Sequence, residues 1–169
     1  MTLAVDAPLV VFAVGNPSRG DDALGPLLLQ RLDAAHLPGV VTVEDFQLQI
    51  EHAVDLQGRQ LALFIDAGQG TPAPFDFTPV QPSFNPAHTS HALSPGDVLA
   101  VYAQAFGTPP PPAFVLCVRG QRFELGEGLS VPAQAHLEAA WEFLLDLCAH
   151  PEAAVWAARH PLPGLPYLP

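Results

Sequence analysis

The sequence predicts an α/β fold with three layers, α/β/α, built around a twisted, mostly parallel sheet. Three apolar runs rich in β-branched residues occupy about 9–14, 40–43 and 61–65. Helical patterns separate them, over about 22–36 and around 50–56. Runs without polar alternation are typical of strands buried on both faces. Strands that alternate with helices imply a parallel sheet with right-handed crossovers.

The second half of the chain continues the pattern. Phe75–Thr78 alternates and is bounded by prolines, which predicts a short antiparallel edge strand. Ser94 is the expected N-cap of a helix with Pro95 at its first position. Another buried strand is expected over 113–118, and a last helix that Ser130 caps and that runs to about 150.

We predict one domain over residues 1–160 and an extended, proline-rich tail over 161–169. Residues 67–95 are irregular and rich in proline, and long loops inside compact domains are often functional.

The composition excludes several classes of partner. The net charge is −11, and all six basic residues are arginines. This balance argues against nucleic-acid binding and against an anionic membrane surface. No run is long enough to span a membrane, no signal peptide is evident, and Cys117 and Cys148 fit buried thiols in a reducing compartment. We therefore expect a soluble, cytoplasmic protein.

Three carboxylates mark the candidate site. Asp21 and Asp22 follow the first strand, and Asp66 ends the third. The carboxyl ends of parallel strands share one edge, where ligands bind, so these groups are expected to meet there and to raise one another's pKa values. An alternative is that Asp21 or Asp22 caps the first helix.

The long loop can bring a histidine to the same edge, either His91 or His88. Two carboxylates and an imidazole suit a borderline divalent ion such as zinc or nickel. The alternative for His91 is a residue near a helix start with no partner.

Two other α/β classes fit less well. A receiver domain of the response-regulator type uses a lysine, and this chain has none. A dinucleotide-binding domain needs G-x-G-x-x-G, whereas residues 15–22 read Gly-Asn-Pro-Ser-Arg-Gly-Asp-Asp, and two carboxylates would repel a pyrophosphate.

Several short motifs together resemble one enzyme family. The strongest is Gly15-Asn16, Arg19-Gly20-Asp21-Asp22 and Gly25-Pro26; the others are Gln47-Leu48 with Glu51-His52, Phe64-Ile65-Asp66-Ala67, Ser90-His91 with Leu93 and Pro95, and Gly120 with Phe123-Glu124, Gly126-Glu127 and Leu129-Ser130. Over residues 9–148 the chain resembles the hydrogenase maturation proteases, endopeptidases that trim the C-terminus of a nickel–iron hydrogenase large subunit. The segments 47–52 and 90–91 most resemble the branch serving soluble, NAD-reducing-type hydrogenases.

The resemblance implies an α/β fold and a site in which Asp22, Asp66 and His91 contact the metal. The nickel is supplied by the substrate, the large-subunit precursor, and zinc or cadmium is expected to substitute for it in the free protein. Asp21, beside the metal position, is a candidate base. The departures are Ala23, where the family often has glycine, and the tail beyond 160. A non-catalytic metal-binding or carrier protein using the same residues is the alternative.

Overall fold

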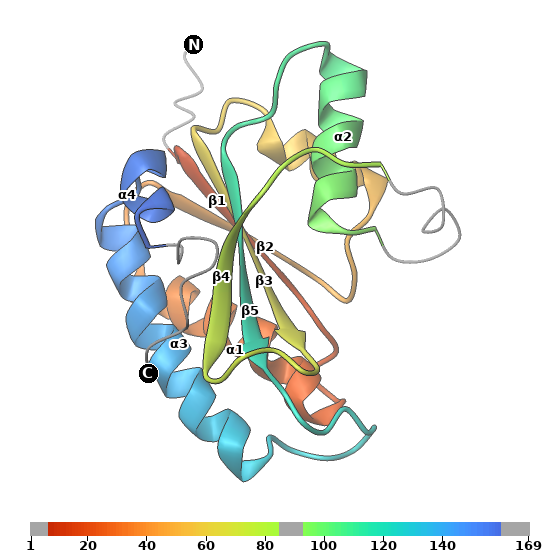
Figure 1. Ribbon diagram of the computed structural model, residues 1–169, viewed down its shortest axis with the longest axis vertical. Helices are drawn as coiled ribbons and strands as arrows, with labels where there is room; N and C mark the ends of the chain where they lie inside the picture. Colours follow the sequence, from red (N-terminus) through yellow and green to blue (C-terminus); the bar gives the residue numbers. More distant parts are fainter. Residues whose placement is uncertain (1–6, 85–92, 160–169) are drawn as a thin grey trace.

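The computed structural model describes residues 7–84 and 93–159 and contains one five-stranded sheet. The strands are β1 (Leu9–Val14), β2 (Val40–Asp45), β3 (Leu61–Gly68), β4 (Phe75–Val80) and β5 (Ala113–Arg119), in the order β2-β1-β3-β5-β4. All neighbours run parallel except β4, which pairs antiparallel with β5 (Figure 1). The predicted α/β class and the antiparallel edge strand are confirmed.

Helices cover both faces of the sheet and complete the three layers. They are α1 (Leu24–Ala35), α2 (Pro95–Phe106), α3 (Val131–Ala149) and α4 (Ala153–Ala157), with two 3₁₀ helices, η1 (Gly20–Ala23) and η2 (Ile50–Leu56). Figure 1 shows α3 and α4 on one side of the sheet and α2 on the other.

Each face of the sheet has its own apolar core, because successive strand residues point to opposite faces. Val11 and Leu63 belong to the core under α1 and α3, which also buries Trp156 of α4. Phe12 and Phe64 point the other way, into the core under α2 and η2, where their rings stack 4.8 Å apart. Burial on both faces explains why the strands show no polar alternation.

The start of the first helix differs from the prediction. The chain forms η1 before α1 begins at Leu24, so both adjacent aspartates lie in the 3₁₀ turn. Neither η1 nor α1 has a side-chain cap, so the capping alternative for Asp21 and Asp22 is wrong. By contrast, Ser94 and Ser130 cap α2 and α3 as predicted.

Two expectations fall on residues that the structure does not describe, namely the histidines of the long loop and the extended tail. In the described ranges, no helix combines the length and apolarity that crossing a bilayer requires.

Candidate active site

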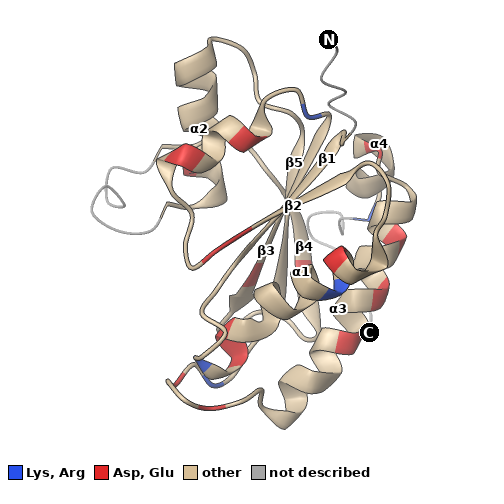
Figure 2. Ribbon diagram, turned by 180° about the vertical axis from the view of Figure 1, so that it is seen from behind, with Lys and Arg blue, Asp and Glu red and all other residues tan. Residues whose placement is uncertain are grey.

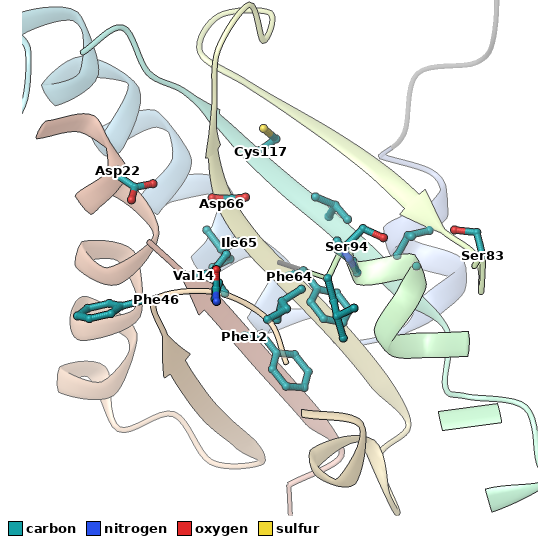
Figure 3. Close-up of a pocket in the computed structure, with 17 residues that line it drawn as sticks. Phe12, Val14, Asp22, Phe46, Phe64, Ile65, Asp66, Ser83, Ser94 and Cys117 are labelled. Atoms are coloured by element: carbon teal, nitrogen blue, oxygen red, sulfur yellow. The ribbon is translucent and has the colours of Figure 1, made fainter. Parts of the chain in front are cut away.

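A cavity of about 580 Å³ opens at the carboxyl ends of β1, β3 and β5. One wall is the segment between β2 and η2, and another is the N-terminus of α2. Its lining includes Phe12, Val14, Asp22, Phe46, Gln47, Leu48, Phe64, Ile65, Asp66, Ser83, Leu93, Ser94 and Cys117. In Figure 3, Asp22 and Asp66 lie near each other on adjacent elements, and Ser83 and Ser94 lie on the far side. The prediction that the strand 1 and strand 3 carboxylates share one edge holds for this pair.

The turn after β1 fixes the position of Asp22. Its Oδ2 accepts a hydrogen bond from the Asn16 backbone N–H at 2.7 Å. Gly15 makes this turn possible, because it has φ of +147° and an added Cβ would lie 2.1 Å from the Asp22 carbonyl oxygen. The Gly-Asn motif therefore holds the backbone and the carboxylate of Asp22 together.

Asp66 is the more strongly perturbed acid. Its Oδ1 accepts a hydrogen bond from the Ala67 N–H at 2.7 Å, which favours the charged form. Burial outweighs that bond and, together with the negative charge of Asp22, raises the pKa of Asp66 to about 6. Part of this group is therefore protonated near neutral pH, and a cation beside it would favour the charged form.

The donor set fits a divalent cation that brings further ligands of its own. Asp22 Oδ1 and Asp66 Oδ2 accept no hydrogen bond within the described part of the chain, while the other oxygen of each carboxylate is oriented by a backbone amide. No group of three potential ligand side chains occurs among the described residues. His91 and His88 lie outside those residues, but Leu93, two positions after His91, lines the cavity.

Asp21 occupies a different environment from the other two acids. It is fully buried and is absent from the cavity lining. Its Oδ2 accepts hydrogen bonds from the N–H groups of Gln121 (2.7 Å) and Arg122 (3.1 Å) and from Ser130 Oγ (2.7 Å), and its Oδ1 accepts one from the Ser130 N–H (2.8 Å).

These hydrogen bonds shift the pKa of Asp21 in the direction opposite to the predicted one. Burial alone would raise it, but the hydrogen bonds from Gln121, Ser130 and Arg122 together lower it. The expectation that crowding raises all three carboxyl pKa values is therefore wrong for Asp21. A carboxylate saturated by four donors and shielded from the cavity is poorly placed to act as a base, and its position favours a structural role.

The contacts that shape the cavity walls were not predicted from the sequence. Leu48 and Leu93 form an isolated antiparallel bridge, and the Ser83 N–H donates to the Gly96 carbonyl at 3.0 Å. His52 stabilises the first wall, because its Nδ1 accepts from the Gln49 N–H at 2.8 Å. The pairing of Gln47-Leu48 with Glu51-His52 in the sequence was the available signal.

Cys117 contributes the only thiol of the cavity lining that the structure describes. Its Sγ lies 3.4 Å from Thr71 Oγ1. Burial, and more weakly the charges of Asp66 and Asp76, raise the pKa of this thiol, so it is neutral near pH 7.

The fold is similar to that of solved [NiFe] hydrogenase maturation proteases. HycI from Thermococcus kodakarensis superposes with a TM-score of 0.65 and 19% identity, over 87% of this chain and 96% of that one. HybD from E. coli gives a TM-score of 0.65 and 22% identity, over 85% and 93% of the two chains. HybD from T. kodakarensis gives 0.63 and 17%, over 83% and 98%.

The sequence itself matches no family profile and no curated protein. At these identities the superpositions show a common fold that extends over nearly the whole of the compared chains.

Proposed function

We propose that the protein is an endopeptidase that removes the C-terminal extension of a nickel–iron hydrogenase large-subunit precursor after nickel insertion. One observation carries the proposal. Two adjacent carboxylates, each with one oxygen oriented and one available, line a cavity on a fold shared with hydrogenase maturation proteases.

In this proposal Asp22, Asp66 and His91 contact the nickel that the precursor already carries. The raised pKa of Asp66 supports such a role, because burial and the charge of Asp22 disfavour its charged form and a bound cation would offset both. The ion brings the adjacent peptide bond to the cavity, and proximity and polarisation then favour its cleavage. An empty precursor lacks this contact, so cutting depends on metal insertion.

Asp21 does not activate water in this proposal, because it is buried, absent from the cavity lining and saturated by hydrogen-bond donors. It positions the adjacent residue instead. We also assign the protein to the branch serving soluble, NAD-reducing-type hydrogenases, on the resemblance of residues 47–52 and 90–91.

The competing function is a metal-binding or carrier protein that uses the same residues without hydrolysis. The fold shared with maturation proteases favours the protease over the carrier.

The deciding experiment incubates the purified protein with large-subunit precursor of the same organism, loaded with nickel or empty, and follows the precursor mass. The proposal expects C-terminal shortening of the loaded form only. Asp66→Asn should abolish cleavage, and the exposed control Glu142→Gln should leave it unchanged. Tight nickel binding by the free protein, without any shortening of loaded precursor, would establish the carrier instead.

A further inference from the structure

The six arginines of this acidic protein differ in whether their side chains have partners. Four of the six have side-chain partners: Arg31 binds Glu138, Arg59 binds the Ala7 and Asp55 carbonyls, Arg119 binds the Thr71 carbonyl, and Arg159 binds Asp146. Arg19 and Arg122 are exposed and have no side-chain hydrogen bond or ion pair to any described residue.

These two arginines sit on two loops that are joined backbone to backbone. The Asp21 N–H donates to the Arg122 carbonyl at 2.6 Å, and an added Cβ on Gly20 would lie 2.5 Å from the same oxygen. Gly20 N–H to the Glu127 carbonyl (3.0 Å) and Gly126 N–H to the Ser18 carbonyl (2.7 Å) extend the contact. The backbones of Arg19 and Arg122 are therefore held close together.

The two segments that carry these arginines, 18–22 and 120–127, are held together by backbone hydrogen bonds and lie next to the cavity. The buried Asp21 carboxylate ties both loops to the start of α3, and the Asp22 N–H donates to the Arg19 carbonyl at 3.0 Å. Figure 2 shows blue and red segments side by side at this end of the sheet. Asp22, on the same turn as Arg19, lines the cavity, while Arg19 and Arg122 are exposed residues outside its lining.

Charge and chemistry point to a carboxylate as the ligand. Guanidinium groups bind carboxylates through paired, charge-assisted hydrogen bonds. Glu124 and Glu127 lie on the same loop and are exposed, yet neither forms an ion pair with Arg19 or Arg122. Two unpaired cations on a chain of net charge −11 are a local exception to its surface charge.

We propose that Arg19 and Arg122 bind a carboxylate of the C-terminal extension and so help align it across Asp22. This inference rests on the proposed function, which supplies the ligand chemistry: an extension removed from a C-terminus ends in a carboxylate and can carry acidic side chains as well. The pair is a specificity determinant for the segment that follows the cut.

The test compares wild type with Arg19→Gln, Arg122→Gln and the double variant. Arg31→Gln is the control for the loss of one arginine elsewhere, at a half-buried position where the side chain pairs with Glu138. Cleavage of nickel-loaded precursor gives kcat and KM, and fluorescence anisotropy follows binding of a labelled peptide with the sequence of the extension. Two altered extensions separate the sources of the carboxylate: one with its acidic side chains amidated, and one lengthened by neutral residues.

We expect the double variant to raise KM and the peptide Kd about fivefold to tenfold with kcat nearly unchanged, and to lose most of this effect in high salt. The altered extension that lacks the recognised carboxylate should bind wild type as weakly as the native one binds the double variant. Equal KM and equal peptide binding by wild type and the double variant would overturn the inference. If wild type binds the peptide through the arginines but cleaves no precursor, the inference stands and the proposed protease activity fails.

Discussion

The raised pKa of Asp66 predicts that, without added metal, the free energy of unfolding of the protein falls as pH rises. The folded-state pKa is about 6 against an ordinary value of 3.8, so the folded protein holds this proton more tightly than the unfolded chain. The stabilising contribution of the proton is complete below about pH 4 and is lost as pH rises through 6. A shift of about two units corresponds to about 3 kcal/mol, an upper value because the side chain is partly exposed.

The variant Asp66→Asn keeps the shape of the side chain and its acceptor for the Ala67 N–H, but it has no proton to lose. We expect its unfolding free energy to exceed that of wild type by about 2 kcal/mol at pH 7.5 and to match it near pH 4. The assay is urea denaturation at half-unit pH steps without added metal, with the exposed Glu142→Gln as the control that removes one charge.

A divalent cation should reverse the ranking at pH 7.5. Metal that binds only the folded state stabilises wild type by mass action, whereas Asp66→Asn should gain little. A constant difference between the two proteins from pH 4 to pH 8 would refute the reasoning, because it would mean that Asp66 titrates normally in the fold.

Three further predictions concern Asp21, Gly15 and the two histidines of the long loop. Asp21→Ala should lower the free energy of unfolding by about 3 kcal/mol in urea denaturation at pH 7, because it leaves buried donors unsatisfied. Since the pKa of Asp21 is lowered in the fold, its carboxylate stabilises the protein above the ordinary pKa and loses this contribution on acidification, so the difference between variant and wild type should shrink toward pH 3. Gly15→Ala should lower the melting temperature and weaken metal binding together, since its Cβ would collide with the Asp22 carbonyl, and an unchanged melt would contradict the tight turn. In zinc titrations by calorimetry, His91→Ala should abolish binding and His88→Ala should not; loss in the second alone would exchange their roles.

Most of the fold could be predicted because it depends on local patterns. The apolar strands over 9–14 and 61–65 are buried on both faces, and Ser94 and Ser130 signal their helix starts through capping chemistry that acts within three residues. The strand order then places Asp66 next to the turn after β1, since β1 and β3 are parallel neighbours.

The role of Asp21 could not be predicted in this way. Three of its four donors are backbone amides, which carry no residue signature, and all four lie 100 to 109 positions away along the chain. Gly20 and Gly120 were the available hint: a Cβ on Gly20 would meet the Arg122 backbone, and one on Gly120 would meet Asp21.

The remote anchoring of Asp21 also bears on the order in which the protein becomes competent during folding. Contacts that close about a hundred residues of chain form late, because the entropy of closing such a loop must be offset before the contact is gained. A nascent chain that ends before Ser130 has both Asp22 and Asp66 but lacks two of the four hydrogen bonds that hold Asp21. The turn that carries Asp22 therefore gains its full set of supporting hydrogen bonds only once the segment before α3 has docked.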